Sequence, residues 1–289
     1  MLSVFFRSIC IRRYPNKAIL DVQKSILVSN NSNPIKSLTK GANSKGGRNF
    51  TGRQTVFSRG GGHKRLYRSV YFGTLLNETF INSSQDISLR VIRVEYDPNR
   101  TSWINLMEME LDNGIRKIFY TLATHDVNAG NILKWGPSAT ITNGNRLPLY
   151  RIPTGTLIHN VELRPNTKSQ LCKSAGTRCK VMRNDYTGSS ILVALPSGRR
   201  IELSPNCYAT VGIVSNILHN QKTRRKAGVS RWLGFRPVVR GISKNPVDHP
   251  HGGRTNGGCH PKTPWGKLTR GVKTRSVRKP KLLVKKKKP

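Results

Sequence analysis

The sequence predicts a mainly β protein with two small barrels in the middle of the chain and long, basic, irregular extensions at both ends. Two observations support this fold class. Between Arg65 and Leu218, apolar and polar residues alternate over short, closely spaced segments without intervening amphipathic helices, which is typical of strands in small barrels. The formal net charge of +38, from 51 Lys and Arg against 13 Asp and Glu, is concentrated outside that region.

The first predicted set of strands forms a meander. Apolar residues alternate with polar ones over 92–96, turn residues follow at 97–100, and an extended pattern resumes over 103–111. The Asn-Gly pair in the turn at 112–114 suits the positive φ angles of a tight hairpin and leads into a third extended segment, 115–122. We therefore predict three antiparallel strands in series.

A second set of short strands is expected further along the chain, over 156–163, 180–183, 191–195, 199–203 and 208–214. The turn-rich stretch 142–148 separates the two sets. We therefore expect one barrel over residues 65–145 and a second over 146–218. One larger barrel or sandwich is the alternative.

The ends of the chain carry most of the charge. Residues 1–64 hold 12 basic residues and one acidic residue, and residues 219–289 hold 21 and one, against 18 and 11 in the middle. With few large apolar side chains, these ends cannot bury enough surface to fold alone, so we expect a polyanion to order them. The longest apolar run, 191–195, is far shorter than the roughly 18 residues that cross a bilayer, and no basic amphipathic stripe suits a membrane surface. No membrane partner is therefore expected.

Two glycine-rich basic motifs follow near the N-terminus, at 45–53 and 59–65. Glycine lets backbone amides approach phosphate closely, and arginine offers a planar fork of donors that bridges phosphate oxygens or stacks on a base. We expect RNA contacts from this arm, with a flexible linker as the alternative. The sequence lacks the Gly-Lys-Ser/Thr spacing of a nucleotide-binding P-loop.

The C-terminal extension repeats this composition at 222–241, where aromatic residues stand among arginines. Trp232 and Phe235 suit stacking on unpaired RNA bases, but they suit equally well a small core of the segment or a cover over a barrel. The lysines at 285–288 are expected to form a solvated cationic tail.

The densest polar motif is 245–254, followed by 259–261. An Asp next to a His suits acid–base chemistry, so an RNA-acting enzyme that uses Asp248 and His249 is an alternative function. The prolines and glycines of the motif instead indicate a rigid loop with no recognisable nucleophile, and its His and Cys lack the paired spacing of zinc sites. We expect no catalytic residue and no metal ligand, and we assign the loop histidines to RNA contacts.

The five cysteines, at positions 10, 172, 179, 207 and 259, are odd in number and lack the spacing of a disulfide framework. A disulfide scaffold is therefore not expected. Buried or idle thiols in a reducing compartment are the expected state.

Six motifs occur in a fixed order along the chain, at 46–49, 60–64, 95–100, 159–162, 174–177 and 245–253, and the segments 231–234 and 263–266 add to them. In these motifs the sequence resembles the second protein of the bacterial-type large ribosomal subunit, the L-two family, from about residue 36 to residue 280. Because the motifs agree in both order and spacing, the resemblance is highly specific.

The resemblance implies an OB-like barrel followed by an SH3-like barrel. The corresponding organisation is a basic arm at 36–64, the OB-like barrel at 65–145, the SH3-like barrel at 146–218 and a basic extension at 219–289. The extensions are expected to enter the rRNA near the peptidyl transferase centre and the subunit interface. The implied partners are large-subunit rRNA, neighbouring ribosomal proteins and the small subunit. No cofactor is expected, and any structural Mg²⁺ would be bound by the rRNA.

Two single residues carry over as rRNA contacts: Arg100, which closes the turn at 97–100, and Lys173, which stands where the family usually has Arg. His249 is expected to support rRNA structure, and Arg254, in place of a usual third glycine, adds a phosphate contact. The complete set of predicted RNA-binding residues is Arg48, Arg53, Arg59, His63, Lys64, Arg65, Arg100, Lys173, Arg225, Lys226, Arg231, Trp232, Arg236, Arg240, Asn245, His249, His251, Arg254, Lys262, Lys267, Arg270, Lys273 and Arg275.

The first 35 residues lie outside the resemblance. Residues 1–20 contain four basic residues, several large apolar residues and no acid, a composition typical of a mitochondrial transit segment. We therefore expect a structural component of a mitochondrial large ribosomal subunit that acts in translation. A bacterial cytoplasmic or plastid version of the same protein is an alternative, and a general nucleic-acid packaging protein is a weaker one.

Overall fold

The structure is a computed structural model that describes residues 33–73, 86–110, 114, 116–184, 190–255 and 258–272. The chain divides into two compact units. The barrel unit comprises the described residues of 1–42 and 65–223, and the arm unit comprises those of 43–64 and 224–281. Most of the expected transit segment lies outside the described residues.

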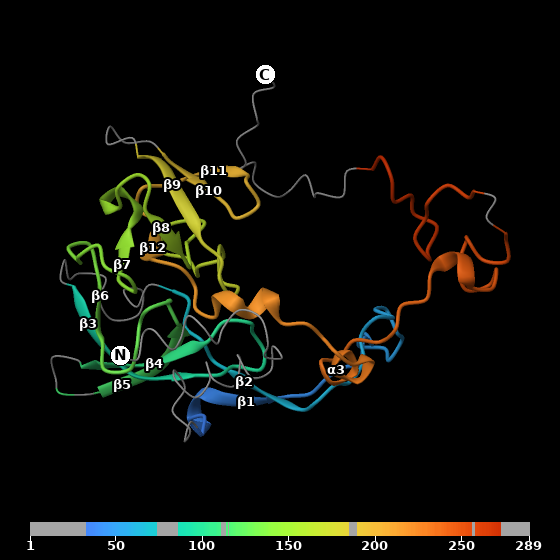
Figure 1. The fold of residues 1–289 in the computed structure, drawn as a ribbon, viewed down its shortest axis with the longest axis horizontal. Helices are drawn as coiled ribbons and strands as arrows, with labels where there is room; N and C mark the ends of the chain where they lie inside the picture. Colours follow the sequence, from blue (N-terminus) through green and yellow to red (C-terminus); the bar gives the residue numbers. More distant parts are fainter. Residues whose placement is uncertain are drawn as a thin grey trace, which may run out of the picture. The chain divides into compact units, whose positions relative to one another are not determined.

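The predicted meander is present in the barrel unit (Figure 1). Strands β3 (Ile87–Glu95), β4 (Ile104–Glu110) and β5 (Arg116–Leu122) pair antiparallel in sequence order. A turn connects β3 to β4, and the register across β4 and β5 places Met107 opposite Phe119. The predicted Asn-Gly turn falls largely outside the described residues, although its glycine, Gly114, has a φ of 71°.

The second predicted set is also present, with four strands shorter than expected and the strand predicted at 180–183 longer. It consists of β8 (Leu157–His159), β9 (Cys179–Asn184), β10 (Ile191–Ala194), β11 (Arg200–Leu203) and β12 (Tyr208–Val211). All pairings between these strands are antiparallel. The mainly β prediction is therefore confirmed, and the fold agrees with an OB-like barrel followed by an SH3-like barrel.

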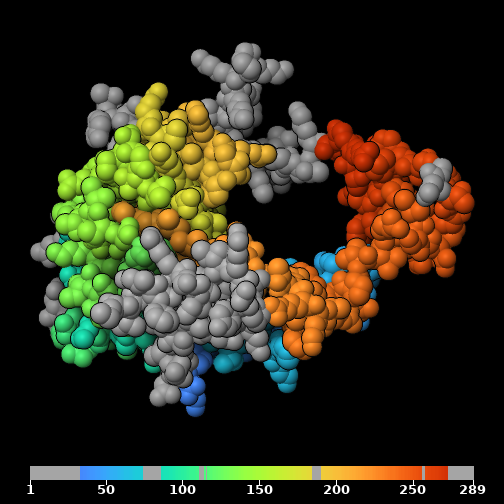
Figure 2. Space-filling view, viewed as in Figure 1, coloured from blue at the N-terminus to red at the C-terminus, as the bar shows by residue number. Residues whose placement is uncertain are grey.

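Four short strands were not predicted. β1 (Thr39–Ala42) and β2 (Arg65–Arg68) form a separate two-stranded sheet, while β6 (Ile132–Trp135) pairs with β3 and β7 (Arg146–Pro148) pairs with β12. A single parallel bridge between Trp135 and Arg146 joins the two strand sets into one ten-stranded sheet. In the space-filling view, the green and yellow residues of the two sets form a continuous surface (Figure 2).

The hydrophobic cores of the two strand sets remain separate despite this shared sheet. One core is built from residues such as Leu89, Met107 and Trp135, and another, larger core contains Ile158 and Val193. Burial alternates along β10 and over 88–91 of β3, as the period-two pattern requires. After a register shift between Val91 and Arg93 the alternation in β3 ends, and Val94 and Glu95 are both buried. We propose that the boundary between the two barrels lies near residue 145, and the separate cores support this division.

A buried ion pair lies where the two strand sets meet. The Arg146 guanidinium donates to the Glu162 carboxylate at 2.7 Å and to the Ser169 hydroxyl at 2.9 Å, and all three residues are buried. The guanidinium also lies 5.8 Å from the ring centroid of Trp135. Removing one partner of such a pair leaves an uncompensated buried charge, so we expect loss of Arg146 or Glu162 to destabilise the second strand set.

Helices are short in the described parts of the chain. The barrel unit contains the 3-10 turns η1 (Lys36–Leu38), η3 (Leu149–Arg151) and η4 (Ile217–Gln221), while the arm unit contains the α-helix α3 (Ala227–Trp232) and the turn η5 (Gly241–Ser243). None of these helices has the length and apolar character needed to cross a membrane.

In the arm unit, the two basic extensions pair with each other. The Gly60 amide donates to the Gly234 carbonyl at 2.8 Å, and the His63 amide donates to the Trp232 carbonyl at 3.2 Å. Figure 1 shows the blue 43–64 segment beside α3. Only His249 and Gly252 are buried among the described residues of this unit, so the arm unit has no apolar core of its own.

Candidate nucleic-acid interface

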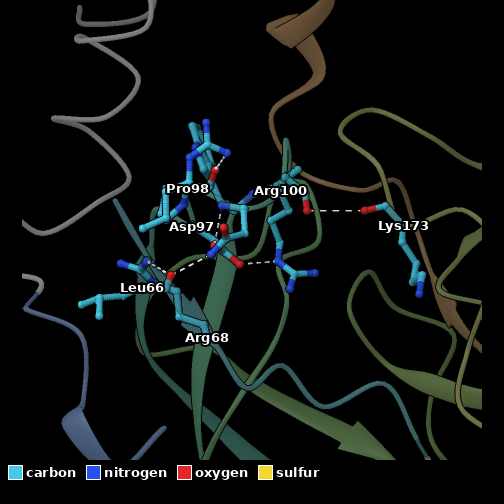
Figure 3. A network of polar contacts seen from close by, with 11 residues as sticks. Leu66, Arg68, Asp97, Pro98, Arg100 and Lys173 are labelled. Atoms are coloured by element: carbon cyan, nitrogen blue, oxygen red, sulfur yellow. Dashed lines mark hydrogen bonds and ion pairs between the residues drawn. The ribbon is translucent and has the colours of Figure 1, made fainter. Parts of the chain in front are cut away.

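The turn that follows β3 holds Arg100 in a fixed position. The Asp97 carboxylate is fully buried and accepts hydrogen bonds from the Asn99 amide at 2.9 Å and from Arg100 Nε. The Asn99 side chain donates to the Leu66 carbonyl at 2.7 Å, and Arg65 donates to the Pro98 carbonyl at 3.1 Å. Asp and Asn favour such turns because their side chains bond to nearby backbone amides. This network restricts the Arg100 side chain, as Figure 3 shows.

Lys173 reaches the same place from the second strand set. Its carbonyl accepts a hydrogen bond from the Ser102 hydroxyl at 3.4 Å, and Lys173 Nζ lies 4.3 Å from the ring centroid of Phe72. The Arg100 guanidinium lies 5.4 Å from the same centroid. The two cationic side chains extend in the same direction in Figure 3. We call them the Arg100–Lys173 pair.

The electrostatics of this pair favour an anion. Asp97 cancels part of the charge of Arg100, but within the described residues no carboxylate lies within ion-pair distance of Lys173. Burial lowers the pKa of Lys173, and the charge of Arg100 lowers it further. A phosphate bound here would compensate both unfavourable effects, because an opposite charge nearby favours the protonated amine. The sequence resemblance named these two residues separately, and the structure brings them together.

The loop that carries Lys173 is docked onto the turn that carries Arg100. The Ala175 amide donates to the Thr101 hydroxyl at 3.1 Å, and the Asn216 side-chain amide donates to the Thr101 carbonyl at 2.6 Å. The Gly176 amide donates to the Val214 carbonyl at 3.2 Å. The two bonds to Thr101 connect the two strand sets, and the bond to Val214 fixes the loop within the second set. Sequence patterns gave no signal for them.

In the arm unit, aromatic rings are covered by cations. The Arg224 guanidinium lies 4.9 Å from the ring centroid of Phe235, and Lys244 Nζ lies 5.1 Å from that of Phe57. Trp232 packs against His63 with 6.3 Å between the ring centroids and is 57% exposed. Phe235 is also exposed, so these rings do not form the buried core that was one sequence-based alternative. They remain available for stacking on bases.

The 245–253 motif forms a tight loop around His249. The ring of His249 is buried, and its Nδ1 accepts a hydrogen bond from the His251 amide at 3.0 Å. Desolvation lowers the pKa of His249, and the charges of His251 and Lys244 add to this effect. Gly252 is required because a Cβ there would lie 2.3 Å from the Asn245 carbonyl oxygen. A neutral, buried ring that is bonded to its own loop indicates a structural role.

The geometry gives no support to acid–base catalysis by Asp248 and His249. Asp248 is exposed, and its carboxylate makes no hydrogen bond to the His249 ring, whose Nδ1 is already bonded to the backbone. The described residues also contain no group of three or more His, Cys, Asp or Glu side chains placed to hold a metal ion.

Most of the other predicted RNA-binding residues lie on the surface. His249 is buried, and five of the predicted residues are half-buried: Arg65, Arg100, Lys173, His251 and Lys262. Two others, Lys273 and Arg275, lie outside the described residues. The remaining ones are exposed: Arg48, Arg53, Arg59, His63, Lys64, Arg225, Lys226, Arg231, Trp232, Arg236, Arg240, Asn245, Arg254, Lys267 and Arg270. Residues 43–64 and 224–281 together contain 21 Lys and Arg and a single acidic residue, Asp248.

In this β protein, the positive charge of the Arg100–Lys173 pair is only partly cancelled by carboxylates, and the arm unit is polycationic. These two features place it in the class of nucleic-acid-binding proteins. Two family models match the chain: "Ribosomal Proteins L2, RNA binding N-terminal domain" over residues 35–134 and "Ribosomal Proteins L2, C-terminal domain" over residues 142–266.

Curated relatives agree with these matches. The large ribosomal subunit protein uL2 of Bartonella tribocorum is 46% identical over 246 residues, which cover 84% of each chain. The uL2 protein of Orientia tsutsugamushi is 45% identical over 262 residues, which cover 90% of each chain. The chain belongs to the ribosomal protein L2 family.

Proposed function

We propose that this protein is the L2-family component of a mitochondrial large ribosomal subunit, where it holds rRNA near the peptidyl transferase region and contributes to subunit association. Family membership makes the chain a structural, non-enzymatic constituent of the large ribosomal subunit that binds rRNA. The observation that carries the RNA contact is the Arg100–Lys173 pair, in which two strand sets present cations side by side and Lys173 meets no carboxylate in the described part of the chain.

The rRNA contact is tested by its dependence on salt. Neutralising many phosphates releases condensed counterions, so affinity for large-subunit rRNA fragments should fall steeply as salt rises. Filter binding of the full chain between low and moderate salt measures this slope. A nearly flat response would rule out extensive phosphate contacts.

The mitochondrial location rests on residues 1–35. The family match begins at residue 35, and the preceding segment contains five Lys and Arg and a single acid, Asp21. The relatives named above are bacterial, so the proposed location rests on the composition of residues 1–35. N-terminal mass spectrometry of assembled ribosomes from isolated mitochondria should detect this chain. Its detection in a cytoplasmic or plastid particle instead would overturn the location.

The remaining partners are neighbouring ribosomal proteins and the small subunit. The exposed cations of the arm unit support further contacts with rRNA. Chemical cross-linking of intact ribosomes, followed by mass spectrometry, should yield cross-links from arm-unit lysines to other large-subunit proteins. The same experiment on joined subunits should also give cross-links to a small-subunit protein or to small-subunit rRNA. If only the large-subunit cross-links appear, the proposed role in subunit association is wrong.

Replacing His249 by Gln separates a structural from a catalytic role. Because the ring is buried and bonded within its loop, we expect the variant to alter ribosome assembly or local rRNA structure. Chemical probing of the rRNA measures this change. Loss of turnover with unchanged assembly and unchanged rRNA structure would instead support an enzyme.

A further inference from the structure

The structure brings two cysteines together that are separated by six residues in the chain. Cys172 Sγ and Cys179 Sγ lie 2.7 Å apart and share a hydrogen bond. The bonded separation in a disulfide is about 2.05 Å, so a small movement of the side chains suffices to join them. The other described cysteines, Cys207 and Cys259, show no such contact with a second thiol.

Both cysteines are anchored to the same strand segment. The carbonyl of Cys172 accepts a hydrogen bond from the Asn160 amide at 3.0 Å, and Cys179 pairs with Ile158 at the start of β9. The backbone of Cys172 has a φ of 49°, which is unusual for a residue with a side chain. The backbone therefore holds the two sulfur atoms face to face.

The intervening residues form the loop that carries Lys173. The chain leaves the barrel after Cys172, forms the loop 173–178, and returns to the barrel at Cys179, where β9 begins. A bond between the two sulfurs would close this loop at its base. It would leave unchanged the loop's hydrogen bonds to Thr101 and Val214.

We propose that Cys172 and Cys179 form a reversible disulfide that closes the 172–179 loop and fixes the Lys173 contact. Formation of the disulfide is independent of the proposed function, whereas its effect on RNA rests on that function. The oxidant is a low-molecular-weight disulfide such as oxidised glutathione. In cells that keep thiols reduced, protein disulfides of this kind are usually transient or redox-sensing.

The exchange takes place in two steps. Cys172 attacks one sulfur of oxidised glutathione as a thiolate, breaks the S–S bond, and releases one glutathione thiolate that takes up a proton. Cys179 then loses its proton and attacks the Cys172 sulfur, which releases the second glutathione. The protein loses two electrons and two protons, and oxidised glutathione gains them to become two reduced molecules.

The environments of the two thiols determine their order of reaction. Cys172 is half-buried and reachable, whereas Cys179 is buried. The hydrogen bond between the two thiols lowers the pKa of Cys172 and raises the pKa of Cys179, which burial raises further. Cys172 is therefore the attacking thiol and Cys179 the resolving thiol.

Trypsin provides a direct assay because it cleaves after Lys168, Lys173, Arg178 and Lys180. The full chain is equilibrated in glutathione buffers of graded composition, free thiols are blocked with N-ethylmaleimide, and the digest is analysed without reduction. We expect peptide 169–173 linked to peptide 179–180, released by reductant, under conditions that leave Cys207 and Cys259 alkylated. Alkylation of Cys172 and Cys179 to the same extent as Cys207 in every buffer would overturn the proposal.

Single variants test the order of attack. Cys179→Ser should leave a stable glutathione adduct on Cys172, whereas Cys172→Ser should leave Cys179 largely unmodified because Cys179 is buried. Equal adduct formation in the two variants would contradict the assigned order. Both measurements depend only on the site of modification and do not require RNA.

The effect on RNA is measured by comparing oxidised and reduced protein on the same rRNA fragment. A preorganised loop loses less freedom on binding, so we expect the oxidised form to bind about two- to fivefold more tightly. The double variant Cys172→Ala, Cys179→Ala should show no redox difference. Equal binding of the two forms would overturn the effect on Lys173. Failure of both forms to bind, with the disulfide present, would instead contradict the proposed function.

Discussion

Lys173 and Arg100 differ in how much of their charge is free to meet a phosphate. Arg100 is bonded to the buried Asp97 carboxylate, which orients the guanidinium and cancels part of its charge. Lys173 contacts the Phe72 ring and, in the described structure, meets no carboxylate. At this site Arg100 contributes orientation and Lys173 contributes net positive charge.

Replacing Lys173 by Met should therefore weaken binding to rRNA fragments and make it less sensitive to salt. Losing one phosphate contact lowers the slope of log affinity against log salt by about 0.7–0.9. Lys117→Met is a matched control because Lys117 is an exposed lysine on β5 that is not among the predicted RNA-binding residues. Lys173→Arg should retain binding, since arginine keeps the charge and adds a fork of donors. An unchanged slope in Lys173→Met would remove this residue from the interface.

His159 makes the stability of the barrel unit depend on pH. Its ring is fully buried, its Nδ1 bonds to the Gly212 carbonyl at 3.1 Å, and its Nε2 lies 3.3 Å from the Thr124 hydroxyl. Burial lowers its pKa from 6.5 to about 4, and the bond to Gly212 only partly offsets this effect. Between these two values the unfolded state binds a proton that the folded state does not, so stability falls as the pH decreases.

We expect the free energy of unfolding to drop by about 2 kcal/mol between pH 7 and pH 5 because of this residue. Denaturant unfolding of the full chain at both pH values, followed by tryptophan fluorescence, measures the loss. In His159→Gln, the decrease in unfolding free energy between pH 7 and pH 5 should be smaller by about 2 kcal/mol. This comparison holds whatever the stability of the variant at pH 7. The same pH dependence in the variant and the original chain would assign the effect to other groups.

Among the structural elements, the pairing between segments 58–63 and 232–236 depends on Gly62. Gly62 has a φ of 62°, and a Cβ there would lie 2.9 Å from the Trp232 carbonyl oxygen. A side chain at this position is unfavourable both for the backbone conformation and for the close approach of the two segments. Gly61, by contrast, has open space around its Cβ position.

Gly62→Ala should separate these two segments, whereas Gly61→Ala should not. Amide hydrogen exchange of Gly60 and His63 reports the pairing, because both amides donate across it. With a large-subunit rRNA fragment bound, we expect exchange to be about 5- to 30-fold faster in Gly62→Ala than in the original chain, as expected for a cost of about 1–2 kcal/mol. Similar exchange in both variants would show that the close approach at Gly62 is not required.

The contrast between elements also explains what the sequence was able to predict. The strands over 92–122 were predicted from the alternation of apolar and polar residues. The burial follows that alternation only in part, because Ile92 is exposed while Val94 and Glu95 are both buried after a register shift in β3, and β4 begins with four buried residues. β1 (Thr39–Ala42) has no buried residue and β7 (Arg146–Pro148) is buried throughout, so neither leaves an alternating pattern in the sequence. The pairing of the two arms and the Cys172–Cys179 contact depend on tertiary geometry that no local pattern encodes.

The sequence predicted the charged residues of the candidate site but not the contacts between them. Arg100 and Lys173 were named from separate motifs, but their shared contact with Phe72 required the folded structure. Phe72 itself was missed because an aromatic residue beside a strand carries no signal of RNA binding. Sequence motifs thus identified charged residues, while the ring and backbone contacts that position them emerged only in three dimensions.

For the whole molecule, the two units differ in what holds them together. The barrel unit contains several clusters of buried apolar residues, whereas only His249 and Gly252 are buried among the described residues of the arm unit. The sequence of the arm-unit segments holds 21 Lys and Arg against one Asp, so mutual repulsion opposes their compaction. A bound polyanion would remove that repulsion and stabilise the existing backbone contacts.

We therefore expect hydrogen exchange of the full chain to change unequally when rRNA binds. Without RNA, amides of β4 and β12 should be strongly protected because they lie in paired strands over a core, while amides of 43–64 and 224–255 should exchange rapidly. Adding a large-subunit rRNA fragment should slow exchange mainly in those two arm segments. A fragment of unrelated double-stranded RNA at the same phosphate concentration controls for charge neutralisation alone. If the arm amides were as protected as those of β4 before any RNA is added, the arm unit would be a self-sufficient fold, and phosphate would not be what orders it.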